Sequence, residues 1–148
     1  MTIAVADPGS FRDPSGTVFQ VNGRIFRSVA AEASQTFHAA RDCGLIDVLV
    51  DRGMLLPAIE ADRGVLEAQA ADAALVLEHP RLPFVSYPYE WGFAVHRRAA
   101  LLHLDLQLAA LERGFTLSDA TAYNVQFIGA RPVFIDHLSL RPYRDGEI

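Results

Sequence analysis

A turn signal between two runs of β-forming residues is the feature that most narrows the folds open to this chain. Asn22 and Gly23 lie in the middle of TVFQVNGRIFRSV, residues 17–29. An Asn-Gly pair suits the type I′ turn of a two-residue hairpin, because both turn residues need a positive φ. With that turn, Phe19 faces Phe26 across the two strands. The chain is therefore predicted to contain an antiparallel sheet.

Two longer segments have the composition and the ends of helices. Residues 30–43 are rich in Ala, lack Gly and Pro, and precede Gly44, which favours a helix with a glycine C-cap. Residues 93–113 form the longest predicted helix and precede Gly114. Its leucines recur at heptad-like spacing: Leu101, Leu104, Leu108 and Leu111. A shorter helix is expected over residues 45–52, so the predicted class is α+β.

The middle of the chain predicts a second hairpin. Residues 75–78 and 83–87 are short apolar runs on either side of a proline-containing turn, and we expect them to pair. Residues 54–73 are ambiguous, because a run that suits a strand is followed by an Ala-rich run that suits a helix.

The two ends of the chain differ in composition from its middle. Residues 1–16 are rich in turn-forming residues and are expected to be loose. We therefore predict one domain over residues 17–140, with residues 141–148 as a linker or the cut end of a longer chain. The lone Cys43 excludes an internal disulfide, and no membrane-spanning stretch or signal peptide is recognised. A cytoplasmic protein is expected.

The charged residues exclude two kinds of function. The formal net charge is −5, so a basic face that neutralises many nucleic-acid phosphates is not expected. All 13 basic residues are Arg and none is Lys, which excludes any reaction that needs a lysine amine, such as Schiff-base formation. Hydrophobic residues make up 51% of the chain, which is typical of a folded domain rather than a disordered one.

The last predicted hairpin carries the residues that point most clearly to chemistry. Its strands are expected over residues 124–128 and 132–135, with residues 129–131 as the loop. With that loop, Asn124 lies directly opposite Asp136, and opposed Cβ atoms of an antiparallel pair are about 5 Å apart. Amide and carboxylate oxygens are hard ligands of the kind that Mg²⁺ accepts together with phosphate oxygens. We therefore predict a metal site at these two residues.

Asp119 precedes Asn124 by five residues and is predicted to lie in the turn after the long helix. Asp119-x-x-x-x-Asn124, followed by an apolar strand pair and Asp136, resembles the catalytic loop and metal-binding Asp of kinases, aminoglycoside phosphotransferases included. The order of hairpin, helix, hairpin, connector, long helix and final hairpin is similar to a kinase small lobe that runs into its large lobe. The resemblance covers residues 17–136 and implies a truncated protein-kinase-like fold.

The kinase resemblance implies a role for each of these residues. Asp119 would be the catalytic base for a substrate hydroxyl, and Asn124 and Asp136 would hold Mg²⁺ on the phosphates of ATP or ADP. The resemblance also implies cofactor-binding residues. Arg27 would be the cation on a strand and Glu32 the carboxylate on the first helix, and Tyr87 and Tyr89 lie in the segment FVSYPYEW, which would be the hinge.

The chain departs from the kinase pattern at several points. The strand lysine of kinases has no counterpart, and the planar fork of Arg27 is not equivalent to an ammonium group. Asp136 is followed by His137 and Leu138 rather than by Phe and Gly, and no complete Gly-rich loop precedes Thr17. His137 is the histidine best placed for a functional imidazole. These departures favour binding over phosphoryl transfer.

A second resemblance rests on the strings YPYEW, LSDATAYNVQF and RPVFID. They are similar to the N-terminal region of a bacterial family of SAM-dependent methyltransferases, some of which are linked to nodulation host specificity. In that family the methyltransferase domain follows this region, and this sequence contains no Gly-rich SAM loop. SAM is therefore expected only in a domain outside this chain, and that C-terminal methyltransferase domain is the expected partner. The chain alone is not expected to transfer methyl groups.

Three functions remain open from the sequence. The first is a binding or docking module with a vestigial nucleotide and Mg²⁺ site. The second is an ATP/Mg²⁺-dependent small-molecule phosphotransferase, and the third is a structural domain that forms a homodimer near the long helix. The structural alternative for Asp119, Asn124 and Asp136 is a turn cap, a strand-edge amide and a strand-terminal carboxylate. The aromatic residues of 84–93 either line a purine pocket or, as is more common for such a cluster, form core.

Overall fold

The computed structural model describes residues 4–10 and 13–147, and the chain divides into two compact units. The first unit comprises Met1–Gln35 and Pro57–Arg81, and the second comprises Thr36–Leu56 and Leu82–Ile148. Helices and antiparallel sheets are both present, which confirms the predicted α+β class. Within the described ranges, no helix combines the length and the apolar character needed to cross a membrane.

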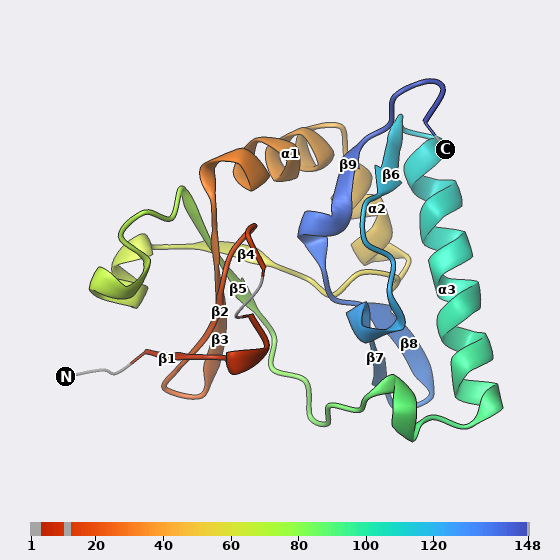
Figure 1. Ribbon diagram of the computed structural model, residues 1–148, viewed down its shortest axis with the longest axis horizontal. Coiled ribbons are helices and arrows are strands. Elements are labelled where there is room, and N and C mark those ends of the chain that lie inside the picture. The colour runs from red at the N-terminus through yellow and green to blue at the C-terminus, as the bar shows by residue number, and fades with distance from the viewer. Residues whose placement is uncertain (1–3, 11–12, 148) are drawn as a thin grey trace. The chain divides into compact units, whose positions relative to one another are not determined.

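The first unit is built on a five-stranded antiparallel sheet with the order β1-β2-β3-β5-β4 (Figure 1). The strands are β1 Val5–Ala6, β2 Val18–Val21, β3 Arg24–Val29, β4 Ile59–Ala61 and β5 Leu75–His79. The predicted hairpin is confirmed, because Phe19 pairs with Phe26. The turn residues Asn22 and Gly23 have φ angles of 50° and 79°, in the left-handed region that a type I′ turn requires.

Alternation along the strands gives this sheet a buried face. Phe19 and Val21 are buried, whereas Gln20 between them is exposed. The 3-10 helix η2, Arg63–Ala70, adds Leu66 to the same cluster. The buried residues of the cluster are Ala4, Phe19, Val21, Phe26, Leu66, Ala73 and Val76.

Part of the N-terminal segment joins this sheet. Val5 pairs with Gln20, and a short 3-10 helix η1 follows at Pro8–Ser10. The main-chain N–H of Val18 donates to Oγ of Ser10 at 3.0 Å. These bonds order part of the segment that was expected to be loose. The domain limits at residues 17 and 140 stay a prediction.

The predicted pairing of residues 75–78 with residues 83–87 is wrong. β5 instead pairs with β3 on one side and with β4 on the other. The described residues 82–87 contain no strand. Pro80 and Pro83 have no N–H to donate to a ladder, which disfavours a return strand at this point.

The three predicted helices are confirmed as α1 Ala31–Asp42, α2 Leu45–Asp51 and α3 Phe93–Leu111. Five residues of α3 are buried: Ala99, Leu102, Leu106, Ala109 and Ala110. The four leucines at heptad-like spacing are exposed instead: Leu101, Leu104, Leu108 and Leu111. The helix is thus apolar on two different faces.

The second unit contains two small antiparallel sheets beside α3 (Figure 1). Their strands are β6 Phe115–Leu117 with β9 Leu140–Pro142, and β7 Val125–Ile128 with β8 Arg131–Phe134. Val125 and Phe134 face each other and are fully buried. The main chain of Phe134 also donates to Met54 at 2.8 Å and accepts from Leu56 at 2.9 Å. This pair is the centre of the β7-β8 packing.

The predicted register of the last hairpin is wrong by one residue. Its loop contains only Gly129 and Ala130, because Ile128 already pairs with Arg131. Asn124 is therefore level with Ile135, whose N–H donates to the carbonyl oxygen of Asn124 at 2.9 Å. Gly129 has a φ of 61° at the first loop position, which suits a two-residue type II′ turn and removes the need for a third loop residue.

Two leucines of α3 test the distinction between its buried and exposed faces. We expect Leu106→Ala to lower the free energy of unfolding by about 2–5 kcal/mol, because it leaves a cavity at a side chain with no exposed surface. Leu108→Ala is expected to change it by less than about 0.5 kcal/mol, because Leu108 is exposed. Urea denaturation followed by circular dichroism measures both. Equal losses in the two variants would contradict the burial pattern.

Candidate functional site

Asp119, Asn124 and Asp136 lie in the turns that flank β7 and β8. Asn124 ends the 3-10 helix η4, Ala122–Asn124, and Asp136 caps the 3-10 helix η5, His137–Ser139. Nδ2 of Asn124 donates to the main-chain carbonyl oxygen of Asp119 at 3.1 Å. The side chain of Asp119 is exposed. The structure therefore joins two of the three predicted residues directly.

Ser139 joins Asp136 to the same carbonyl group. Its Oγ lies 2.7 Å from the main-chain oxygen of Asp119 and 2.9 Å from Oδ2 of Asp136. Ser139 is buried. We call Asp119, Asn124, Asp136 and Ser139 the loop cluster. Ser139 is not among the residues predicted from the sequence, although its place three residues after Asp136 lets a hydroxyl reach back to the carboxylate across one 3-10 turn.

The carboxylate of Asp136 is oriented by donors on both oxygens. Oδ1 accepts from the main-chain N–H of Leu138 at 3.1 Å, and Oδ2 shares the single hydroxyl proton of Ser139 with the carbonyl oxygen of Asp119. The amide nitrogen of Asn124 is engaged by Asp119, so Oδ1 is the Asn124 atom that is suited to a cation. Each atom is held by the turn in which it lies rather than by pairing across the strands.

The side chains of Asp136 and Asn124 offer oxygen atoms as possible metal ligands. Among residues 4–10 and 13–147, no group of three or more His, Cys, Asp or Glu side chains is arranged to hold a metal ion. Mg²⁺, however, is commonly bound by one or two carboxylates while phosphate oxygens and water supply the remaining ligands. The carboxylate of Asp136 and the amide oxygen of Asn124 are donors of this type.

His137 is part of the core. It has no exposed surface, and its ring centroid lies 6.3 Å from that of Phe37 in a tilted arrangement. A substrate has no access to a ring in this position, so the geometry favours packing over the functional imidazole considered from the sequence.

Arg27 and Glu32 belong to the first unit and are described within it. Nη2 of Arg27 lies 2.6 Å from Oδ2 of Asp13, and the Arg27 side chain is only 10% exposed. Glu32 is exposed in the first turn of α1. Arg27 is therefore already engaged by a carboxylate and must leave it before it can meet a phosphate.

The aromatic connector is exposed rather than buried. Tyr87 and Tyr89 are exposed and stack with their ring centroids 5.5 Å apart. Trp91 is held differently, because Nε1 donates to Oγ of Ser86 at 2.9 Å. The side chain of Gln126 bonds to both the N–H and the carbonyl oxygen of Ser86 at 3.0 Å. The interpretation of this cluster as core is therefore wrong for the two tyrosines.

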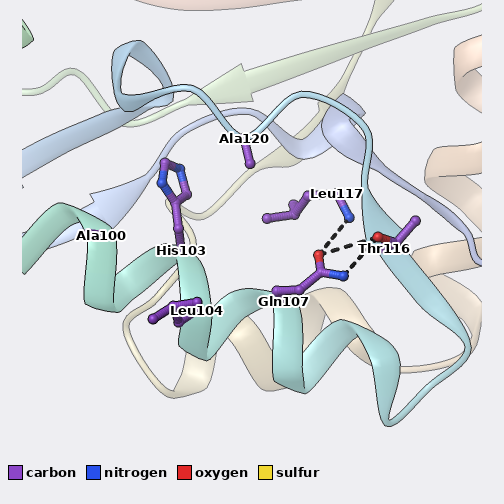
Figure 2. Close-up of a pocket in the computed structure, with 7 residues that line it drawn as sticks. All are labelled: Ala100, His103, Leu104, Gln107, Thr116, Leu117 and Ala120. Carbon is purple, nitrogen blue, oxygen red and sulfur yellow. Dashed lines mark hydrogen bonds between the residues drawn. The ribbon is translucent and has the colours of Figure 1, made fainter. Parts of the chain in front are cut away.

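A pocket of about 530 Å³ lies between α3 and the segment that leads from β6 to Asp119 (Figure 2). Its lining is mostly apolar: Ala100, His103, Leu104, Gln107, Thr116, Leu117 and Ala120. Oε1 of Gln107 accepts from the N–H of Leu117 at 3.1 Å, and its Nε2 donates to Oγ1 of Thr116 at 2.9 Å. These bonds attach the far wall of the pocket to the helix. Sequence analysis did not identify this pocket.

His103 is the titratable group of this pocket. Its ring is edge-on to Phe134 with centroids 5.6 Å apart, and among the described residues Nε2 is buried with no hydrogen-bond partner. Burial lowers the pKa of the His103 imidazole from its ordinary value of 6.5. The imidazole is therefore neutral near pH 7.

The sequence is homologous to the N-terminal part of a longer protein. No family model matches the chain. It is 51% identical over 140 residues to the nodulation protein NoeA of Rhizobium meliloti (strain 1021). The match covers 95% of this chain but only 29% of that relative. The predicted similarity to the N-terminal region of nodulation-linked proteins is thereby confirmed at the level of homology.

Ser139→Ala tests whether the loop cluster stabilises the second unit. We expect a loss of about 1–3 kcal/mol in the free energy of unfolding, because the substitution removes a buried hydroxyl that bonds to a part-buried carbonyl oxygen and a carboxylate oxygen. Ser118→Ala is the matched control, since the exposed Ser118 also bonds to a main-chain carbonyl. Urea denaturation that shows no greater loss for Ser139→Ala would contradict the assignment.

His103 predicts a pH dependence of stability. The pKa of His103 is lower in the folded chain than in the unfolded chain, so folding favours the neutral ring. The stability that depends on the neutral ring is fully present above pH 6.5 and is lost as the pH falls through the pKa of the folded state. A nuclear magnetic resonance titration should place the midpoint of His103 below 6.5, with His103→Gln used to assign the resonance. Urea denaturation at several pH values should show a smaller acid-side loss in His103→Gln. A midpoint at or above 6.5 would refute this explanation.

Proposed function

We propose that this chain is the kinase-like N-terminal module of a longer methyltransferase-family protein, and that it binds a nucleotide with Mg²⁺ without transferring phosphate. The observation that carries the proposal is the loop cluster, in which Asp119, Asn124 and Asp136 are joined through one carbonyl group and Ser139. The main-chain carbonyl of Asp119 thereby brings the Asn124 amide and, through Ser139, the Asp136 carboxylate into one neighbourhood.

The order of the elements supports the kinase-like part of the proposal. Along the chain, the hairpin of β2 and β3 is followed by α1 and α2, then by β4 and β5 of the same antiparallel sheet, and then by the connector that leads to the long α3. Beyond α3, β6 precedes the loop with Asp119, and β7 and β8 separate Asn124 from Asp136. Apart from the second hairpin, where β5 pairs with β3 and β4 instead of with residues 83–87, this order agrees with the one on which the kinase resemblance rests.

The proposed roles follow from the atoms available in the loop cluster. Asp136 and Asn124 would hold Mg²⁺ through carboxylate and amide oxygens, and the ion would neutralise charge on the nucleotide phosphates. The exposed stacked pair Tyr87 and Tyr89 would offer aromatic surface to a purine. Asp119 would orient a polar group of the ligand with its exposed carboxylate.

The cations of the chain favour binding over phosphoryl transfer. There is no lysine in the sequence, and Arg27 is paired with Asp13 at 2.6 Å. Transfer requires a cation that stabilises the charge developing on the phosphoryl oxygens. A site that lacks this cation would bind the ground state of the nucleotide without accelerating the reaction.

Methyl transfer and SAM are assigned to a part of the longer protein outside this chain. The chain spans 29% of the length of NoeA, so most of that relative lies outside the matched region. The C-terminal methyltransferase domain would be the natural partner of this module.

Calorimetric titration with ADP in the presence of Mg²⁺ tests the nucleotide site. We expect binding in the wild type, and a loss of at least about tenfold in affinity for Asp136→Ala, equivalent to about 1.4 kcal/mol, because the carboxylate that balances the ion is gone. Asp145→Ala, at an exposed carboxylate in the C-terminal tail, is the control and should bind like the wild type.

One outcome of that titration and one outcome of a separate phosphate-release assay with ATP decide against the proposal. An absence of heat in the wild type would leave only a docking role for the module. Steady phosphate release from ATP that disappears in Asp119→Asn would instead support a phosphotransferase.

A further inference from the structure

A row of exposed leucines follows α3. Leu101, Leu104, Leu108 and Leu111 are 46%, 62%, 62% and 41% exposed. Their spacing of three, four and three residues is that of positions a and d in two heptads, so they lie along one stripe of the helix. We call these four residues the α3 leucine stripe.

The opposite side of α3 is already used for packing. Leu102, Leu106 and Ala109 are buried in the second unit. α3 thus has two apolar faces, and an apolar face of a helix is typically covered by a neighbouring element. The α3 leucine stripe therefore has the composition of an interface.

The surroundings of the stripe indicate what covers it. The pocket beside α3 is partly lined by Leu104 and by Ala100, so the surface has a hollow at the edge of the stripe into which a side chain can insert (Figure 2). Asp105 and Glu112 are exposed and follow Leu104 and Leu111 by one residue, at the position that flanks such a seam. The matching surface is an amphipathic helix with basic residues beside its apolar ridge.

We propose that the α3 leucine stripe is the docking face for a helix from the part of the longer protein that lies outside the matched region. The inference rests on the proposed role of this chain as an N-terminal module. In NoeA the 140 matched residues are 29% of the length, so enough polypeptide is present to supply the cover. After β9 the chain returns to the C-terminal end of α3, where the N–H of Tyr143 donates to the carbonyl oxygen of Gly114 at 2.8 Å. Polypeptide that follows this point starts near the C-terminal end of α3.

A photo-cross-linking residue tests the occupant of the stripe. It is placed in intact NoeA at the position aligned with Leu104, and a second protein carries it at the position aligned with Ile59, which is 64% exposed in the first unit. We expect the Leu104 position to give a cross-linked peptide from outside the matched 140 residues, and the Ile59 position to give none. Cross-links to a second copy, or only to the matched region, would overturn the proposal.

A paired stability measurement gives an independent answer. In this chain, Leu104→Gln combined with Leu108→Gln should leave the urea midpoint unchanged, because both side chains are exposed. The same substitutions at the aligned positions of intact NoeA should lower the midpoint, because the stripe is covered there. An unchanged midpoint in intact NoeA would refute docking. Neither readout requires nucleotide, so a failure of ADP binding with intact cross-linking would refute only the nucleotide site.

Discussion

The two-residue turn at Gly129 and Ala130 controls the geometry of the candidate site, because it sets the register of β7 against β8. With this turn, Val125 faces Phe134, and both side chains are fully buried. A slip of one residue would move each side chain to the opposite face, and the loss of this buried pair would make the slip costly.

Asp136 consequently follows the paired residues and enters a 3-10 turn. There its carboxylate contacts the N–H of Leu138 and the hydroxyl of Ser139.

This arrangement explains how the loop cluster is held together without direct strand pairing. The carbonyl oxygen of Asp119 accepts from both Asn124 and Ser139, so one main-chain atom positions groups from two separate turns. The proposed binding of Mg²⁺ together with phosphate uses oxygen atoms held in this way. The ion pair of Arg27 with Asp13 removes the most obvious substitute for the missing lysine, which is why nucleotide binding is the stronger hypothesis.

The two apolar faces of α3 connect the structure to the homology. One face packs within the second unit, and the other carries the α3 leucine stripe in contact with solvent. Exposed leucine at heptad spacing has an energetic cost unless it is covered, because apolar surface in water is unfavourable. The match to 29% of a longer relative offers a source for the missing cover.

The sequence by itself determined the local elements, because their signals depend on neighbouring residues. The Asn22-Gly23 turn predicted its hairpin and register, the glycines after α1 and α3 marked the ends of those helices, and the residue types at 119, 124 and 136 identified the candidate site. Tertiary structure alone decided the position of β5 between β3 and β4, since strand partners distant in sequence leave no local pattern. It also decided which face of α3 is buried, because both faces are apolar and periodicity cannot distinguish them. The contribution of Ser139 likewise depends on a turn geometry in which one hydroxyl reaches two acceptors from different segments.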